Sequence, residues 1–220
     1  MTPNIDGLAS TIMGLSRGSQ RFMTAIAGPP GAGKSTISAA LAAALSEASP
    51  SEVAVLPADG FHYDNILLNR LGLQDRKGAP DTFDCAGFEG LLKRVRMREP
   101  VVAPLFDRDL DVARAGAILI GENVSHVVVE GNYLLAGVGP WAVMRQYFDL
   151  TIYVDVPREE LKRRLLARWT DLGRSRQAAH DWVHGNDLLN VDYVKTTRGE
   201  ADIVWRWSAE NADVPAVSKS

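Results

Sequence analysis

Cysteine and long apolar runs are the scarcest features of this sequence. The single cysteine of its 220 residues, Cys85, cannot form a disulfide within the chain, which is typical of a reducing compartment. Asp84 and Ala86 beside it offer no positive charge to activate the thiol, so we expect a structural role. The apolar runs are too short to span a bilayer, and the N-terminus lacks the pattern of a signal peptide. These absences predict a soluble cytoplasmic protein.

Histidine and net charge are also low. The four histidines lack the spacing of metal ligands, so no zinc site is predicted. A net charge of −3 gives no electrostatic reason to expect a nucleic acid or an anionic membrane as partner. The Asn-Lys-x-Asp motif that reads guanine in GTPases is missing. The remaining composition is that of a globular protein, and the length suits a single domain over residues 1–220.

A glycine-rich motif is the most informative feature that is present. It follows a strand-like run at 22–27 and precedes an alanine-rich helical stretch at 37–45. In this context Gly-x-x-x-x-Gly-Lys-Ser wraps a phosphate with backbone N–H groups, and the helix N-terminus adds partial positive charge. Lys34 would reach the β- and γ-phosphates, and Ser35 would bind Mg²⁺. The motif consists of Gly28, Pro29, Pro30, Gly31, Ala32, Gly33, Lys34, Ser35 and Thr36. It predicts a nucleoside triphosphate site.

The rest of the chain alternates apolar runs with helical patterns. Such alternation predicts an α/β fold: a three-layer αβα sandwich with a mostly parallel central sheet. Strands are expected at 21–27, 53–57, 101–106, 117–120, 126–131, 150–156 and 202–207. Helices are expected at 4–18, 34–47, 65–71, 87–97, 141–148, 158–172 and 178–189. The polar residues 208–220 are expected to form a flexible tail.

Two carboxylates follow predicted strands at the edge where such sheets bind ligands. Asp59 comes after 53–57; it suits a general base that takes a proton from an alcohol, or a Mg²⁺ contact through water. The alternative is an aspartate that caps the next helix. Glu130 ends the strand at 126–129 and suits the acidic residue near the metal, the alternative being an exposed or capping carboxylate.

A cluster of arginines lies on and after the helix predicted at 158–172. One interpretation is a solvated helix face, as in most charged runs. The other is a small lid, at about 158–178, that closes over the triphosphate and supplies guanidinium groups to the developing charge. Arg168 and Arg174 are the best candidates for that role.

Four short segments carry a resemblance to a known family. Ala58 to His62 looks like the strand-end motif of bacterial pantothenate kinases, in which the aspartate is the catalytic base. Residues 76–84 look like a segment near the acceptor site of the same enzymes, and Val128 to Gly131 is similar to their second acidic motif. Residues 103–107 resemble the Pro-x-Tyr-Asp stretch of uridine kinases. The chain thus resembles the phosphoribulokinase/uridine kinase/bacterial pantothenate kinase family of P-loop kinases, from about residue 20 to about 207.

The resemblance implies ATP and Mg²⁺ as cofactors, Asp59 as base, arginines in a lid and the possibility of a homodimer. The acceptor site that it implies comprises Asp59, Phe61, His62, Lys77, Phe106, Asp107 and Arg108. The acceptor itself stays open between a sugar, a nucleoside and a pantothenate-like molecule. Uridine kinases have a histidine where this chain has Asp111, and pantothenate kinases have Tyr-Ser-His at 106–108. The nearest branch is that of bacterial sugar-transport-associated kinases.

Two functions therefore compete. The first is an ATP-dependent kinase that phosphorylates a hydroxyl group of a small polar metabolite. The second is a nucleotide-hydrolysing ATPase or switch coupled to a protein partner. The charged residues 107–111 favour the first, because carboxylates and guanidinium groups bind hydroxyls well, although Asp109 and Asp111 also suit a solvated loop.

Overall fold

The computed structural model describes residues 4–49 and 52–208. The α-helices are α1 (Ile5–Leu15), α2 (Lys34–Ala48), α3 (Asn65–Leu71), α4 (Cys85–Arg96), α5 (Arg158–Asp171), α6 (Arg176–Trp182) and α7 (Leu188–Thr197). The strands are β1 (Phe22–Ala27), β2 (Glu52–Pro57), β3 (Val101–Asp107), β4 (Val112–Ile120), β5 (Val124–Gly131), β6 (Leu150–Asp155) and β7 (Ile203–Arg206). Short 3₁₀ helices include Ala58–Phe61 and η4 (Gly139–Tyr147), and a π-helical segment, Val183–Asp187, joins α6 to α7.

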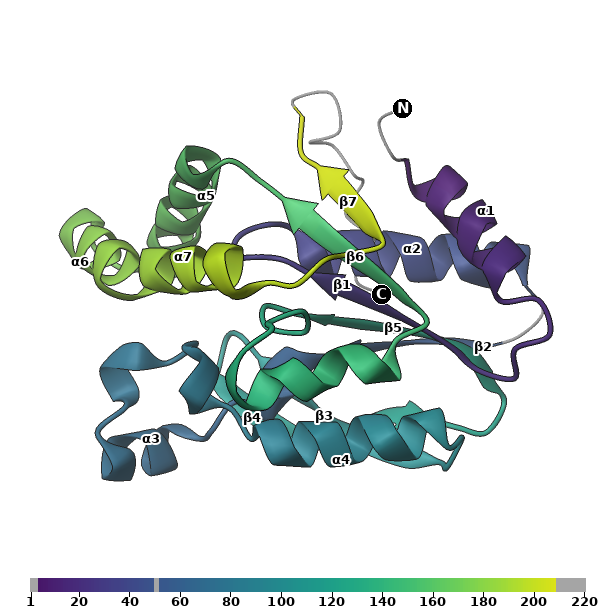
Figure 1. Cartoon of the computed structure of the whole chain (residues 1–220). Coiled ribbons are helices and arrows are strands. Elements are labelled where there is room, and N and C mark those ends of the chain that lie inside the picture. The colour runs from purple at the N-terminus through teal and green to yellow at the C-terminus, as the bar shows by residue number, and fades with distance from the viewer. Residues whose placement is uncertain (1–3, 50–51, 209–220) are drawn as a thin grey trace.

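Five strands form one parallel sheet in the order β2-β5-β1-β6-β7 (Figure 1). The central strand β1 pairs with β5 from Phe22↔His126 to Ala27↔Gly131 and with β6 on its other side. All six residues of β1 are buried, as expected for a parallel strand covered on both faces. Because the strands run the same way, the carboxyl ends of β1, β2 and β5 meet at one edge of the sheet.

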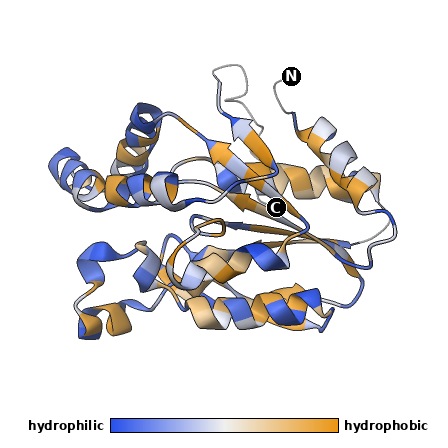
Figure 2. Cartoon of the chain, in the orientation of Figure 1, coloured by the Kyte–Doolittle hydropathy of each residue, from blue (hydrophilic) through white to orange (hydrophobic). Residues whose placement is uncertain are grey.

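The alternation of side chains along the strands divides the core into two parts. Met23 and Ala25 of β1 pack on one face with residues of α4 and η4. Phe22 and Ile26 point to the opposite face and pack with residues of α1 and α2. The strands and α2 are accordingly coloured as mostly hydrophobic in Figure 2, whereas α5 and α6 carry many hydrophilic residues. The helices above and below the sheet confirm the predicted three-layer αβα architecture.

The segment between α4 and β5 differs from the prediction. β3 and β4 form their own antiparallel two-stranded sheet, and β4 begins at Val112 rather than at residue 117. Residues 114–117 (Arg-Ala-Gly-Ala) are exposed, so this strand lacks the apolar alternation by which a half-buried strand is detected. The charged segment expected between two short strands is reduced to the turn at 108–111.

Two predicted helices also differ from the structure. Residues 139–147 are 3₁₀-helical rather than α-helical, and the buried Trp141 and Met144, three residues apart, lie on one side of this helix. The helix predicted at 178–189 is a longer run from Arg176 to Thr197, interrupted by the π-helical segment. Buried polar side chains such as Asn190 break the apolar pattern there.

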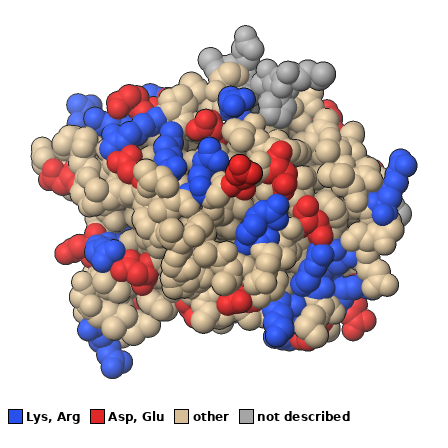
Figure 3. All heavy atoms as spheres, viewed as in Figure 1, with Lys and Arg blue, Asp and Glu red and all other residues tan. Residues whose placement is uncertain are grey.

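The lengths of the apolar segments and the distribution of surface charge agree with the short apolar runs and the small net charge of the sequence. None of the helices within 4–49 and 52–208 is long and apolar enough to cross a membrane. On the face in Figure 3, basic and acidic side chains are interspersed rather than separated. The tail predicted over 208–220 lies, except for Ser208, outside the described residues.

Candidate active site

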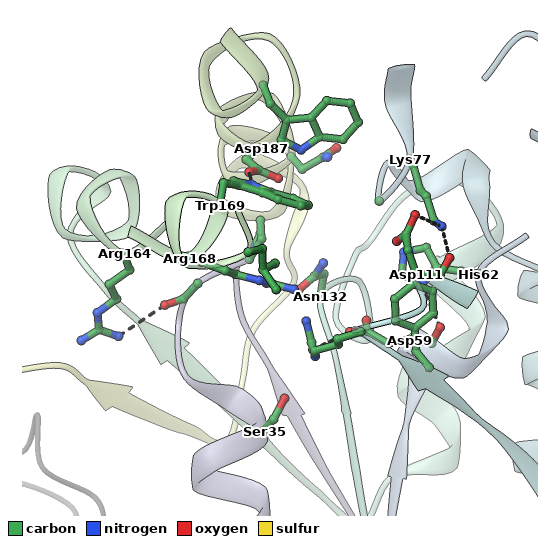
Figure 4. Close-up of a pocket in the computed structure, with 18 of the residues that line it drawn as sticks. Ser35, Asp59, His62, Lys77, Asp111, Asn132, Arg164, Arg168, Trp169 and Asp187 are labelled. Atoms are coloured by element: carbon green, nitrogen blue, oxygen red, sulfur yellow. Dashed lines mark hydrogen bonds and ion pairs between the residues drawn. The ribbon is translucent and has the colours of Figure 1, made fainter. Parts of the chain in front are cut away.

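A cavity of about 720 Å³ opens at the edge of the sheet where β1, β2 and β5 end. Figure 4 shows Ser35 of α2 at its base, with Arg168, Trp169 and Asp187 of the α5–α7 segment on one side. Residues Asp59, His62, Lys77 and Asp111 face them from the other side. The cavity is therefore enclosed by the phosphate loop, the α5–α7 segment and the residues between β2 and β4.

The loop after β1 has the backbone of a phosphate cradle. Gly31 and Gly33 adopt φ of +80° and +92°, a region that side-chain-bearing residues rarely enter. A Cβ on Gly28 would lie 2.9 Å from the carbonyl oxygen of Val154. Gly33 provides no side-chain cap to α2, so the first N–H groups of that helix stay open to an anion.

Lys34 is held at the cavity by hydrogen bonds. Its ammonium donates to Asn132 Oδ1 at 2.6 Å and to the Pro29 carbonyl at 3.1 Å, and only 8% of the residue is exposed. Burial lowers the pKa of Lys34, and the carboxylates Glu130 and Asp59 oppose this shift. An ammonium has three N–H donors, so one remains for a ligand.

Beside the loop, the buried Glu130 is hydrogen-bonded to the exposed Ser35. The Ser35 hydroxyl donates to Glu130 Oε1 at 2.8 Å. Burial, and then the charge of Asp59, raise the pKa of Glu130. A hydroxyl and carboxylates fit Mg²⁺, which prefers oxygen ligands and usually keeps waters and substrate phosphates. No group of three or more His, Cys, Asp or Glu in the described part of the chain could hold a metal ion alone, so phosphate oxygens would complete this site.

Asp59 lies across the cavity from Lys34, in the 3₁₀ turn after β2. Its Oδ2 accepts from the Arg108 guanidinium at 2.9 Å. Burial alone would raise the pKa of Asp59, but His62 and the cations Arg108 and Lys34 bring it below its ordinary value. The carboxylate is thus ionised and oriented, as a proton acceptor needs to be. The helix that follows, α3, is capped by the side chain of Asp64 and not by that of Asp59.

His62 supports the Asp59 turn. Its Nδ1 lies 2.8 Å from the Asp59 carbonyl oxygen, and its ring lies between Phe83 and Phe106, at centroid distances of 3.9 and 4.9 Å. Burial lowers the pKa of His62 although Asp59 opposes the shift. A carbonyl oxygen can only accept, so Nδ1 carries the hydrogen of this contact.

The three arginines of the α5–α7 segment that line the cavity have different environments. Arg168 lines the cavity, and burial, followed by the charge of Arg108, lowers its pKa. Arg164 pairs with Glu160 and donates to the loop carbonyls of Gly31 and Ala32 at 3.3 and 3.4 Å. Arg174 lies over the rings of two tryptophans, Trp169 and Trp182, at 4.3 and 4.6 Å.

Most of the predicted site residues line the one cavity. They are Pro30, Gly31, Gly33, Lys34, Ser35, Thr36, Asp59, His62, Lys77, Phe106, Arg108, Glu130, Arg168 and Arg174. Gly28, Pro29 and Ala32 belong to the loop without lining it. Phe61 and Asp107 also lie outside the lining, because Phe61 packs on Phe88 at 4.9 Å and Asp107 accepts from the backbone N–H groups of the β3–β4 turn.

Comparison with known proteins assigns this arrangement to a family. The sequence profile of the Phosphoribulokinase / Uridine kinase family matches residues 23–212. The chain belongs to this family. It is a P-loop kinase, a phosphotransferase that uses ATP and a hydroxyl group of a small molecule as acceptor.

Three similar proteins illustrate the range of the family. A protein of Schizosaccharomyces pombe, provisionally named a uridine kinase, is 31% identical over 90% of this chain and 88% of its own length. The pantothenate kinase of Ligilactobacillus salivarius is 30% identical over 74% of this chain and 54% of its own. The crystal structure of a protein from Silicibacter sp. TM1040, provisionally named a fructose transport system kinase, has a TM-score of 0.87 and 40% identity, covering 92% and 99% of the two chains.

Several lining residues of this family member were not predicted from its sequence. Asn132 follows Glu130 by two residues at the end of β5, so its position at a strand end could have indicated it. Gln74, Asp187 and Asn190 carry no motif or periodicity of their own. Asp187 is in the π-helical segment, and π-helical turns are frequent at functional sites.

The buried carboxyl group of Asp187 should make the stability of the protein depend on pH. Its Oδ2 accepts from Trp169 Nε1 at 2.6 Å, and burial raises its pKa to about 6. Between pH about 4 and about 6 the folded protein keeps this proton while the unfolded chain releases it, so stability falls as the pH rises. Measured by urea unfolding, the free energy of unfolding of the native protein should fall across this pH range by on the order of 3 kcal/mol relative to that of Asp187→Asn.

The exposed Asp171, the last residue of α5, provides the control for that experiment. Asp171→Asn should unfold with the pH dependence of the native protein, because it removes a carboxylate from solvent rather than from a buried site. Parallel stability curves for native protein and Asp187→Asn would contradict the assignment.

Proposed function

We propose that this kinase transfers the γ-phosphate of ATP to a hydroxyl of a small polar metabolite, a sugar, a nucleoside or a pantothenate-like molecule, with Asp59 as general base. The observation that carries this proposal is the placement of Asp59 and Lys34 in the lining of one cavity. Each shifts the pKa of the other, and Arg168 acts on both. A γ-phosphate bound by Lys34 would therefore face a hydroxyl bound by Asp59.

The chemistry required of the chain is limited. Asp59 accepts the hydroxyl proton as the oxygen attacks the γ-phosphorus, and the bond to the bridging oxygen breaks to leave ADP. Lys34 and Arg168 supply N–H donors to the phosphoryl oxygens. When bound with ATP, Mg²⁺ would be held by Ser35 and Glu130 and would neutralise phosphate charge.

Among the arginines, Arg168 is the better candidate for the phosphates. Within residues 4–49 and 52–208 its guanidinium has no hydrogen bond or ion pair to another residue and only one cation–π contact, with Trp169 at 5.7 Å, and it is close enough to Asp59 to affect the pKa of that carboxyl. Arg174 is held over Trp169 and Trp182, so moving it costs two cation–π contacts. Arg164 is tied to Glu160 and the loop carbonyls and would support the loop.

Acceptor-dependent release of ADP tests the proposal. With Mg-ATP, we expect one class of compound among sugars, polyols, uridine, pantothenate and ribulose 5-phosphate to raise the rate at least about tenfold, because a positioned hydroxyl replaces water as the attacking group. The rate without acceptor is the control. Equal hydrolysis with and without every acceptor would contradict the proposal and favour an ATPase coupled to a protein partner.

A further inference from the structure

The basic residue Lys77 is already saturated with partners inside the protein. Its ammonium has three N–H donors, and three oxygens take them: Asn65 Oδ1 at 2.8 Å, the Asp111 carbonyl at 2.7 Å and Asp111 Oδ2 at 2.9 Å. Only 9% of the Lys77 side chain is exposed. An anionic group on the acceptor could bind this ammonium only by displacing one of these oxygens.

The same contacts fix the orientation of Gln74. Since the Lys77 ammonium can only donate, the Asn65 atom facing it is the oxygen Oδ1. Gln74 approaches that oxygen at 3.3 Å and must do so with Nε2, its donor. Its Oε1 is then left buried with no hydrogen-bond partner, in a residue that lines the cavity. A buried acceptor without a donor is costly, and a ligand hydroxyl would satisfy it.

His62 presents a second acceptor. Its Nδ1 hydrogen is used by the Asp59 carbonyl, so the neutral ring keeps a lone pair on Nε2. Together with the Asp59 carboxylate, the acceptor end of the cavity offers oxygen and nitrogen lone pairs, while the three N–H donors of Lys77 and one of the two N–H donors of Gln74 are already in use.

Charge at this end of the cavity also opposes an anion. The lining there includes the carboxylates of Asp59, Asp75, Asp109 and Asp111 and the cations Lys77 and Arg108. Both cations pair with carboxylates, Arg108 with Asp59 and Lys77 with Asp111. The other cations of the cavity, such as Lys34 and Arg168, belong to the loop and the α5–α7 segment.

We infer that the acceptor is an uncharged molecule with several hydroxyl groups, such as a free sugar, a polyol or a nucleoside, and that it carries neither a phosphate nor a carboxylate. Its hydroxyls would donate to Asp59, His62 and Gln74. This inference rests on the proposed kinase function and narrows it, because it excludes pantothenate and sugar phosphates.

Matched pairs of acceptors test the inference directly. Fructose is compared with fructose 6-phosphate, ribulose with ribulose 5-phosphate, glycerol with glycerate and pantothenol with pantothenate; uridine is a separate arm for nucleosides. In the pair with measurable turnover, kcat/KM from ADP release should be at least about tenfold higher for the neutral member, because a like charge beside carboxylates is strongly disfavoured. A separate measurement of ATP binding shows that the protein is folded and can bind the nucleotide.

Asp111→Asn tests the role of the Lys77 pair. It removes the charge that neutralises Lys77, so the ratio of kcat/KM for the charged to the neutral member should rise at least about threefold. Asp81→Asn is the matched control. It removes the same charge from an aspartate that pairs with Arg76 at 3.0 Å outside the lining, and it should leave the ratio unchanged.

The outcomes separate this inference from the function beneath it. Preference for the neutral member supports it. A higher kcat/KM for the charged member would overturn the inference of a neutral acceptor and leave the kinase function intact. The inference would also be overturned if none of the neutral compounds, uridine included, supported turnover by protein that binds ATP. A rate of ATP hydrolysis that is the same with and without every acceptor would overturn the kinase function, and this inference with it.

Discussion

We expect Asp59→Asn to lower kcat for ADP release at least about 100-fold, the usual contribution of a general base. Asparagine has the size of aspartate and can still accept from Arg108 through its amide oxygen, but it cannot take the hydroxyl proton. The affinity for ATP should stay within about threefold, because Asp59 acts on the acceptor hydroxyl rather than on the nucleotide. Steady-state kinetics and equilibrium binding of ATP measure the two quantities.

Asp192→Asn is a fitting control for this substitution. Asp192 pairs with Arg158 at 2.9 Å, as Asp59 does with Arg108, but outside the cavity. Its replacement should leave kcat unchanged, since an exposed ion pair contributes little. An Asp59→Asn enzyme with near-native kcat would show that the base is another group.

The pKa of Asp59 adds a pH signature to this test. Because His62, Arg108 and Lys34 hold the pKa of Asp59 below its ordinary value, the base stays ionised through the pH range in which an ordinary aspartate titrates. A loss of kcat/KM on acidification that begins above this range must therefore come from another group. Asp187, with a pKa of about 6, and Glu130, whose pKa is raised by burial, are the candidates.

We expect Lys34→Ala to reduce kcat/KM for ATP at least about 1,000-fold, which would remove detectable turnover. In the proposed role, the ammonium would be the loop's charged contact to the β- and γ-phosphates, and the partly desolvated site would make its charge effective. Acceptor-dependent ADP release at rising ATP concentration measures the loss.

Lys34→Met separates loss of charge from loss of packing. Lys34 is buried, and its truncation leaves Asn132 Oδ1 and the Pro29 carbonyl without their donor. Methionine fills the space of the aliphatic chain, so a folded Lys34→Met protein that is equally inactive assigns the effect to the ammonium. Lys93→Met, on the exposed face of α4, should behave as native protein. Turnover retained in Lys34→Met would contradict the phosphate assignment.

Much of the phosphate end of the site could be predicted from local sequence. The loop motif is contiguous, so the glycines, Lys34 and Ser35 are recognisable without any tertiary contact. Asp59 and Glu130 were predicted because parallel strands deliver their carboxyl ends to one edge, and both line the cavity. What they do in the reaction remains a proposal.

The acceptor end was less predictable because its contacts join distant segments. Lys77 is bound by Asn65 and Asp111, from α3 and from the turn between β3 and β4. Phe61 and Asp107 looked equivalent to their neighbours in the sequence. Their side chains instead pack on Phe88 and close the β3–β4 turn, because a short motif does not tell which side of the backbone faces the ligand.

The sequence by itself determined that this protein is an α/β kinase with a triphosphate loop, because apolar periodicity and a contiguous loop motif are local properties. Only the tertiary structure decided which donors remain free. Lys77 reads as a cation in the sequence, but its partners lie 12 and 34 residues away, and they saturate it. The lone pair of Gln74 is left open for the same reason. Hydrogen-bond saturation depends on packing between remote segments, which no short sequence pattern records.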